Sequence, residues 1–321
     1  MLLKLNNLRV GITNEHSLAE ILAHKFNIDK GNIGDIKVLR RAIDARRKNN
    51  ICLVYHLSLD LAVSGKKLDT ILQDKNISKM DELKRDKLVC GSEELCERPV
   101  VIGAGPAGLI ATLELAKRGY KPLLVERGKC LAERVEDVDA FWRTGEFNPI
   151  SNVQFGMGGA GTFSDGKLTT RINDPIVSSI LEIFVAAGAP EEILYEQKPH
   201  VGTDKLRLMV SNLARQIEEF GGEIFYNSQV KGLILKAGKV VGVELLNGDK
   251  IVTNAVIMAI GHSARDTYEK LLEQGIAMEA KAFAIGVRVE HDQTVIDRAQ
   301  YGDFAGHPKL GTADYALVHH E

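Results

Sequence analysis

The sequence predicts an α/β fold: a parallel-sheet domain that carries an insertion, preceded by a small α+β domain. Three observations support this prediction. All 8 prolines lie at or after Pro99, and only 5 of the 30 glycines come before it, so the chain changes character near residue 98. A glycine-rich turn then joins an apolar strand to an apolar helix. Residues 131–199 separate this unit from the next regular helix and strand, which indicates an inserted domain because such long loops are uncommon.

Composition excludes several classes of protein. The 321 residues carry 41 Lys+Arg against 43 Asp+Glu, and this net charge of −2 gives no support for nucleic-acid binding. The apolar run Ala255–Ile260 is far shorter than the ~20 residues of a membrane span, and Met1–Val10 lacks the apolar core of a secretory signal. We expect a cytoplasmic protein with reduced thiols and no metal site. Neither zinc spacing nor a C-x-x-C pair occurs among its four cysteines, Cys52, Cys90, Cys96 and Cys130.

The N-terminal part predicts a β-α-β-β arrangement. The alternation of apolar and polar residues over Leu3–Val10 is typical of a strand. Ser17 and Glu20 have the spacing of a capping box, which opens an amphipathic helix. Residues 35–48 fit either a helix or a strand, whereas Ile51–Leu61 predicts a strand.

Charged residues are frequent in the rest of the N-terminal part. The segment Lys66–Arg98 predicts a helix followed by a linker. A basic cluster near the third predicted element has two interpretations, a patch for phosphate or a partner and a solvated face. The general rule that charge runs lie at the surface favours the solvated face. The members of this cluster are Arg40, Arg41, Arg46, Arg47 and Lys48.

The strongest signal is a G-x-G-x-x-G turn between the strand Val100–Ile102 and a helix. Gly103 permits the tight turn, Gly105 has no side chain to block a pyrophosphate, and Gly108 lets helix and strand pack closely. Pro106 suits the first helical turn, where an amide hydrogen would be unpaired. The N–H groups of this turn attract phosphate. The predicted phosphate-binding residues are Gly103, Gly105, Pro106, Ala107 and Gly108.

An acidic residue follows the second strand, Leu123–Val125. Glu126 lies 23 residues after Gly103, where its carboxylate can accept hydrogen bonds from both ribose hydroxyls. Arg127 beside it is predicted to belong to the same site. A ribose 2′-phosphate about 4 Å away would be repelled by on the order of 4 kcal/mol at an effective dielectric of ~20, which disfavours NADP. The alternative to a dinucleotide site is a glycine-rich βαβ unit that packs on itself.

The later elements resemble the FAD domain of the glutathione-reductase-like flavoproteins. A long amphipathic helix precedes short antiparallel strands over residues 230–252, and the apolar strand Ala255–Ile260 ends in Gly261. In that family the backbone at the position of Val230 contacts the adenine, and the stretch that contains Ala259 and Gly261 is the second nucleotide motif. The resemblance implies that the cofactor is FAD.

Four stretches narrow the resemblance to the bacterial FAD-dependent dehydrogenases of uncharacterised function: Phe141-Trp142 and residues 148–172, 261–272 and 283–291. That family also carries a small N-terminal α+β domain, and its substrate is not established. The resemblance implies an FAD-dependent oxidoreductase whose flavin accepts a hydride from a small molecule. Because the family chain continues past the position of Glu321, we expect a C-terminally truncated chain that lacks the closing strand of the FAD domain and binds FAD weakly.

The expected domain boundaries follow from this order of elements. Residues 1–98 form the small α+β domain and its linker. Residues 99–130 and 200–262 form a Rossmann-like FAD-binding domain. Residues 131–199 and 263–321 form an incomplete inserted or substrate domain.

A second formal match to the glycine motif, Gly156–Gly161, lacks a preceding apolar strand and a following helix, so it predicts a glycine-rich loop. We expect Gly158, Gly159 and Thr162 of this loop on the flavin side, and the alternative is an ordinary glycine turn. Four side chains near these motifs would orient a substrate or touch the cofactor, or are surface groups: Asp165, Lys167, Arg171 and His262. The sequence identifies no catalytic acid or base.

The electron donor and the partners stay open. No C-x-x-x-x-C pair follows the second strand, so a thiol–disulfide relay is not expected. No second NAD(P) fingerprint occurs, so NAD(P)H would be a transient electron donor. One alternative to an oxidoreductase is a nucleotide-binding module whose regulatory or protein-binding role centres on residues 1–98. Another is a plain NAD dehydrogenase, which the insertion and the second nucleotide motif disfavour.

Overall fold

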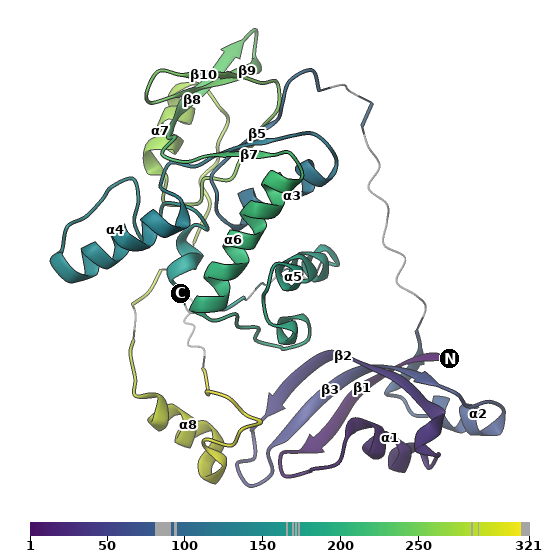
Figure 1. Ribbon diagram of the computed structural model, residues 1–321. Helices are drawn as coiled ribbons and strands as arrows, with labels where there is room; N and C mark the ends of the chain where they lie inside the picture. Colours follow the sequence, from purple (N-terminus) through teal and green to yellow (C-terminus); the bar gives the residue numbers. More distant parts are fainter. Residues whose placement is uncertain are drawn as a thin grey trace. The chain divides into compact units, whose positions relative to one another are not determined.

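The computed structural model describes residues 1–80, 91–92, 95–164, 166–168, 170, 172, 174–283, 285–287 and 289–315, and they divide into two compact units (Figure 1). The N-terminal unit contains the described parts of residues 1–88, 194–198 and 283–321. The nucleotide unit contains those of residues 89–193 and 199–282. The sequence grouped residues 263–321 with residues 131–199, whereas the structure places the part from residue 283 in the N-terminal unit. No helix in the described residues is long and apolar enough to cross a membrane.

The N-terminal unit is a four-stranded antiparallel sheet in the order β2-β3-β1-β4. The segment that fitted either a helix or a strand is strand β2, and β4 is a short strand that the sequence did not predict. Together these elements make a β-α-β-β-α-β motif. In chain order they are β1 (Leu2–Gly11), α1 (Leu18–Phe26), β2 (Ile33–Asp44), β3 (Cys52–Leu61), α2 (Lys66–Leu72) and β4 (Ile77–Lys79). The predicted capping box opens α1: Glu20 N donates to Ser17 Oγ, and Ser17 N donates to Glu20 Oε2.

One face of this sheet carries the core of the N-terminal unit. Alternate residues of β1 and β3 pack against α1 and α2, among them Leu3, Leu5, Leu57, Leu59 and Leu61. At the far end of the sheet the core is completed by a distant segment that contains α8 (Gln293–Tyr301). Tyr301, Leu310 and Ala313 bury against Ile12 and Ile51. This contact explains why the last described segment belongs to this unit, because buried apolar area is what stabilises such packing.

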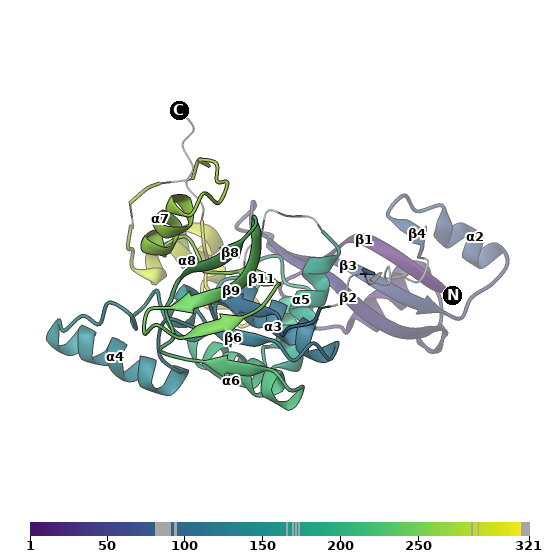
Figure 2. The ribbon, with the colours of Figure 1, turned by 90° about the horizontal axis from the view of Figure 1, so that it is seen from above.

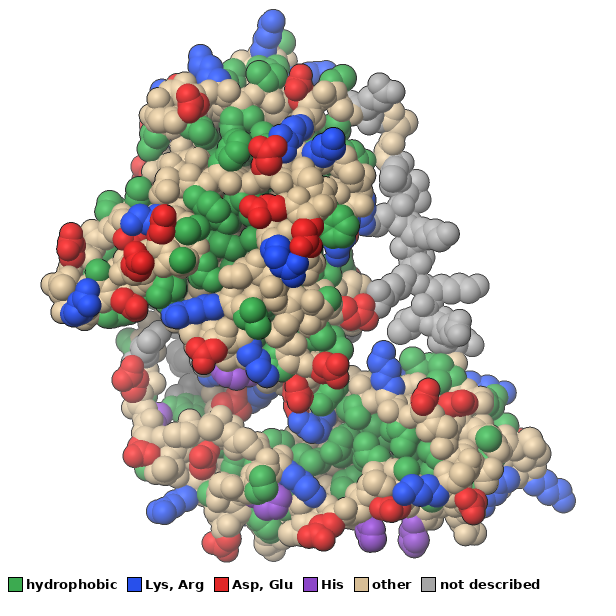
Figure 3. Space-filling view, viewed as in Figure 1, with side chains coloured by type: hydrophobic (Ala, Val, Ile, Leu, Met, Phe, Trp, Pro, Cys, Tyr) green, Lys and Arg blue, Asp and Glu red, His purple; other side chains and the backbone are tan. Residues whose placement is uncertain are grey.

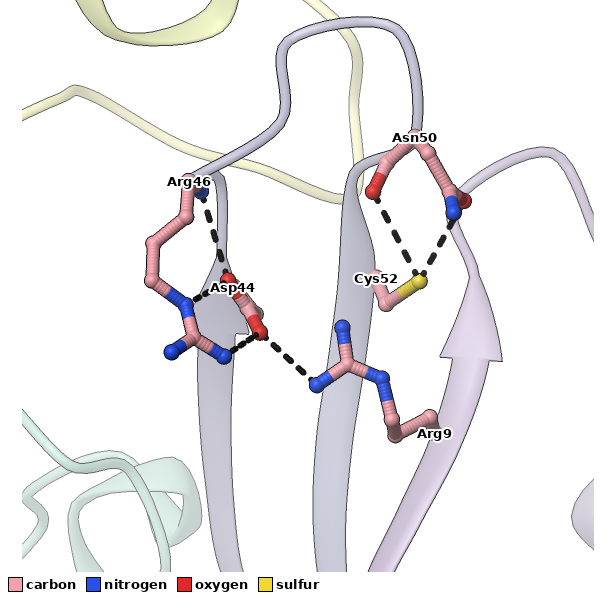
Figure 4. A network of polar contacts seen from close by, with 5 residues as sticks. All are labelled: Arg9, Asp44, Arg46, Asn50 and Cys52. Carbon is pink, nitrogen blue, oxygen red and sulfur yellow. Dashed lines mark hydrogen bonds and ion pairs between the residues drawn. The ribbon is translucent and has the colours of Figure 1, made fainter.

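The basic cluster of the N-terminal unit does not form one patch. Arg46 donates to Asp44, which also accepts a hydrogen bond from Arg9 (Figure 4). The same view shows the Cys52 thiol directed at the backbone and side chain of Asn50. Arg41 donates to Glu196 of the segment that lies beside β2. Two of the five basic side chains are therefore paired with carboxylates, and the geometry gives no support for a phosphate patch.

The nucleotide unit is built on a parallel sheet in the order β11-β5-β6-β7. A separate antiparallel sheet has the order β10-β9-β8. The strands are β5 (Val100–Ile102), β6 (Leu123–Val125), β7 (Glu223–Phe225), β8 (Val230–Lys236), β9 (Lys239–Leu245), β10 (Lys250–Val252) and β11 (Val256–Met258). The helices are α3 (Pro106–Lys117), α4 (Leu131–Thr144), α5 (Ile176–Ala186), α6 (Thr203–Glu219) and α7 (Arg265–Glu273).

The central strands β5 and β6 are covered on both faces, so they are apolar and buried throughout. Val101 and Leu124 face a core shared with α3 and α6. Their neighbours Val100 and Val125 face the antiparallel sheet and α7. Figure 2 shows the β8–β9 ribbon and α6 on opposite sides of β6. The expected α/β class and Rossmann-like arrangement are confirmed.

The inserted residues add helices to this same unit. Helix α5 and the turn after it bury Phe184, Ala187 and Ile193 in the core of α3 and α6. Helix α4 projects from the unit in both views of the ribbon (Figures 1 and 2). On the face drawn in Figure 3, acidic and basic side chains of the nucleotide unit are interspersed, which agrees with the small net charge.

Candidate functional site

A cavity of about 380 Å³ lies where the parallel strands end. Its walls come from the residues that directly follow β5, β6 and β11, together with the start of β8 and of α7. Strand β5 has β6 on one side and β11, the last described strand, on the other, so the order of the strands reverses at β5. Such a switch point is where ligands bind in open parallel sheets.

The first glycine turn forms the floor of this cavity. Gly103 has φ +101°, in the region that only glycine adopts easily, and its N–H donates to the carbonyl of Val125. Gly105 is the N-cap of α3 and supplies no capping side chain, and Pro106 occupies the first turn. A Cβ at Gly108 would lie 1.8 Å from the carbonyl oxygen of Gly103. The open helix terminus therefore presents backbone N–H groups and positive dipole to the cavity.

Glu126 lines the cavity but is only 5% exposed. Its Oε2 accepts a hydrogen bond from Ala104 N at 2.7 Å, and its Oε1 accepts from Gly128 N and Gly156 N, each at 2.9 Å. A carboxylate has about four acceptor positions. Three are used by the backbone, which leaves about one at Oε2 for a ribose hydroxyl. The sequence predicted that this side chain accepts hydrogen bonds from both ribose hydroxyls, whereas the structure leaves an acceptor position for about one.

The second glycine stretch packs on the first as a loop, as its sequence context predicted. Gly158 N donates to the carbonyl of Ala104 at 2.8 Å. A Cβ at Gly159 would lie 3.0 Å from the Cα of Gly105. Of the three residues predicted for the flavin side, Gly159 lines the cavity, whereas Gly158 and Thr162 are buried behind its wall. The Thr162 hydroxyl is directed at the carbonyl of Met157.

A guanidinium group closes one side of the cavity. Arg127 Nη2 donates to Asp266 Oδ1 at 2.8 Å and to Thr267 Oγ1 at 3.0 Å, and its Cζ lies 4.4 Å from the centre of the Phe155 ring. Burial acts to raise the pKa of Asp266, but the hydrogen bond and charge of Arg127 outweigh burial and hold that pKa below its ordinary value. Arg127 thus ties the start of α7 to the end of β6.

The structure brings most of the predicted binding residues to one cavity. Besides the first glycine turn, Glu126 and Arg127, the residues Val230, Ala259 and Gly261 line it, and so does His262. Gly108 does not line it and acts through close packing. Six residues that line the cavity were not predicted as site residues, because none belongs to a recognisable binding motif in the sequence. They are Gln154, Phe155, Ser228, Ser263, Thr267 and Tyr268.

The remaining candidates lie elsewhere. Asp165 and Arg171 are outside the described residues. Lys167 does not line the cavity and forms an isolated β-bridge with His200. Cys52, Cys96 and Cys130 carry free thiols. In the described part of the chain, no group of three His, Cys, Asp or Glu side chains could hold a metal ion.

These features fit an FAD-type dinucleotide. Two glycine turns offer backbone without side chains, a helix terminus faces the same space, and a buried carboxylate lies at the end of the neighbouring strand. The glycine turns and the helix terminus suit the pyrophosphate, which needs close approach and N–H donors, and the carboxylate suits the ribose, which needs an acceptor.

The chain is similar to several known proteins. An uncharacterized protein of Clostridium beijerinckii is 44% identical over 320 residues, which cover 99% of this chain and 60% of that protein. The digeranylgeranylglycerophospholipid reductase of Haloferax volcanii is 27% identical over 204 residues, covering 64% of this chain and 44% of that protein. The THI4 structure of Thermovibrio ammonificans matches with a TM-score of 0.37 and 20% identity, covering 57% of this chain and 64% of that one. The chain thus spans 60% of the length of its Clostridium relative.

Three family profiles match the chain. A domain of unknown function matches residues 2–60. A profile described as the C-terminal domain of an FAD-dependent protein matches residues 282–321. The profile described as pyridine nucleotide-disulphide oxidoreductase matches residues 97–297, which contain the whole cavity and more than half of the chain. The chain therefore belongs to the pyridine nucleotide-disulphide oxidoreductase family.

Proposed function

We propose that this chain binds FAD in the cavity of the nucleotide unit and forms part of an oxidoreductase that acts on a small molecule. The observation that supports it most is the meeting of both glycine turns and the Glu126 carboxylate at one switch point of the sheet. When bound, FAD supplies a flavin ring that accepts and releases a hydride.

The residues of the chain have separate tasks in this proposal. The start of α3 binds the pyrophosphate through N–H groups and its dipole. The open acceptor position at Glu126 Oε2 orients the ribose and repels a 2′-phosphate. Gly159, Ala160 and Gly161 form a wall without large side chains, so their backbone can approach the cofactor. Arg127 holds the opposite wall in place.

Electron donor, location and partner are finer parts of the same proposal. We infer that NAD(P)H docks transiently, because the sequence has only one dinucleotide fingerprint with a strand and a helix around it. Free thiols at Cys52, Cys96 and Cys130 support a cytoplasmic location. A protein partner would use the N-terminal unit, whose antiparallel sheet has helices on one face.

Thermal unfolding with added nucleotides tests the proposal. FAD at about 100 times its dissociation constant stabilises the folded protein by about 2.7 kcal/mol, and NADP has no such effect. The variant Gly105→Ala should keep the stability of the wild type and lose this response, because its Cβ meets nothing closer than 3.9 Å and projects where the pyrophosphate binds.

The matched control is Gly11→Ala in β1 of the N-terminal unit, where a Cβ has no neighbour within 4 Å. This variant should respond to FAD as the wild type does. Bleaching of the bound flavin under anaerobic conditions with NADH, NADPH and a panel of organic donors then identifies the donor class. A wild-type chain that shows no stabilisation by FAD would overturn the proposal.

A further inference from the structure

A buried arginine lies beneath the second glycine loop. Arg134, in α4, is 0% exposed, whereas Trp142 near the far end of the same helix is 69% exposed. A fully buried arginine is rare unless it is paired with an acid. Among the described residues Arg134 forms no ion pair with a carboxylate, its hydrogen bonds go to backbone carbonyls, and its Nη2 has no hydrogen-bond partner.

The guanidinium of Arg134 holds the loop at several points. Its Nε donates to the carbonyl of Asn152 at 2.9 Å, and its Nη1 donates to the carbonyls of Gly156 at 3.2 Å and Met157 at 2.6 Å. Its Cζ lies 4.9 Å from the centre of the Phe163 ring. One rigid side chain therefore contacts both ends of the loop from Asn152 to Phe163.

The contact depends on glycine. Gly156 has φ +117°, and a Cβ there would lie 2.4 Å from Cδ of Arg134. The first glycine of the second stretch therefore makes room for the arginine below it, and its other side lines the cavity. Arg134 itself does not line the cavity.

Gly156 also connects Arg134 to the site. Its N–H donates to Glu126 Oε1 while its carbonyl accepts from Arg134 Nη1. Burial lowers the pKa of Arg134 to about 10, and the charge of Glu126 acts in the opposite direction. Arg134 thus remains a cation at neutral pH, and Gly156 bridges it to the buried Glu126 carboxylate.

We propose that Arg134 is a positioning residue of the FAD site: it fixes the loop 152–163 against the first glycine turn, and its charge offsets Glu126. This inference depends on the proposed binding of FAD. Without Arg134 the loop loses three hydrogen bonds, and the carboxylate stays buried beside an anionic pyrophosphate without a counter-charge. The result is a more mobile loop and a weaker site, although no group that touches the ligand has changed.

The test compares Arg134→Met and Arg134→Lys with Arg143→Met, an exposed arginine of the same helix. In the ligand-free protein, hydrogen exchange of peptides covering 152–163 should be faster in Arg134→Met than in the wild type, with the β8–β9 peptides unchanged. FAD should bind roughly tenfold or more weakly to Arg134→Met. Arg134→Lys keeps the positive charge but loses the planar set of donors, so its FAD affinity should lie between those of the wild type and Arg134→Met. Arg143→Met should match the wild type.

Chemical rescue separates positioning from a general loss of packing. Guanidinium ion at millimolar concentration should restore FAD binding to Arg134→Ala, whereas ammonium should not, because only the planar ion reproduces the fork of donors. If Arg134→Met has the hydrogen-exchange rates and the FAD affinity of the wild type, the inference is wrong and the proposed function still holds. Failure of the wild type to bind FAD would overturn the proposed function, and loop exchange would then decide alone whether Arg134 fixes the loop.

Discussion

The two glycine stretches, Gly103–Gly108 and Gly156–Gly161, share a letter pattern but have different structures. The first joins β5 to α3 and opens a helix terminus toward the cavity. The second forms a turn and a short 3-10 helix that packs on the first through the hydrogen bond from Gly158 to Ala104. The comparison teaches that the flanking strand and helix, and not the glycines, decide which stretch opens a helix terminus into the cavity. The second stretch supports the first.

The sixth position of each stretch gives the largest expected difference. Gly108→Ala should lower the free energy of unfolding by about 3 kcal/mol or more, because its Cβ would lie 1.8 Å from the carbonyl oxygen of Gly103. Gly161→Ala should change it by less than about 0.5 kcal/mol, because no atom lies within 4 Å of its Cβ. Denaturant unfolding measures both. Equal losses in the two variants would contradict the comparison.

The carboxylate that joins the two stretches comes next. Glu126→Gln should lower the free energy of unfolding by about 2 kcal/mol. Its amide nitrogen must face a backbone N–H, which then lacks an acceptor. FAD affinity should fall as well, because Glu126 Oε2, which accepts from Ala104 N, is also the atom proposed to accept from the ribose. Chemical unfolding and flavin fluorescence titration measure the two effects. Glu133→Gln, at an exposed position of α4, is the control and should change neither.

The third position separates stability from binding. Gly158→Ala should cost about 1–2 kcal/mol, because Gly158 has φ +87° and its Cβ would meet Thr162 Oγ1 at 2.1 Å. Gly105 has φ −74°, so alanine there should leave stability within about 0.5 kcal/mol of the wild type and weaken FAD binding instead. Thermal unfolding with and without FAD distinguishes these outcomes. A Gly158→Ala variant that has wild-type stability but does not respond to FAD would show that Gly158 contacts the ligand directly.

The smallest effect is expected at Thr162. Its hydroxyl lies 3.4 Å from the carbonyl of Met157 and is 1% exposed, so Thr162→Val should cost only about 0.5–1 kcal/mol. FAD affinity should not change, because Thr162 does not line the cavity. A clear loss of affinity in a titration would restore the sequence-based assignment of this hydroxyl to the flavin side.

Local sequence patterns predicted the parts of the site that lie next to one another along the chain. The apolar strand, the glycine turn and the acid after the second strand each depend on residues within one turn or strand, so periodicity and spacing suffice to find them. Arg134 gave no such signal, because charged side chains in an amphipathic helix are normally solvated. The same holds for the link from Arg127 to Thr267, whose partners are 140 residues apart.

The N-terminal unit shows the same limit at the level of the fold. Its capping box at Ser17 was readable, since both partners lie within four residues. The short strand β4 was not, because Ile77–Lys79 becomes a strand by pairing with β1, which lies far away in the sequence. Nor could the sequence show that Tyr301 completes a core that begins at Ile12.

The sequence by itself determined the strand–turn–helix, the acid at its second strand and the need for glycine in the first turn, because each of these shows in the identity and spacing of consecutive residues. Only the tertiary structure decided that the second glycine stretch lies on the first, that Glu126 spends three acceptor positions on the backbone, and that a buried arginine holds the loop. Apart from the contact of Gly128 with Glu126, those contacts join residues at least 18 positions apart. Their formation depends on packing and desolvation, which the order of residues does not display.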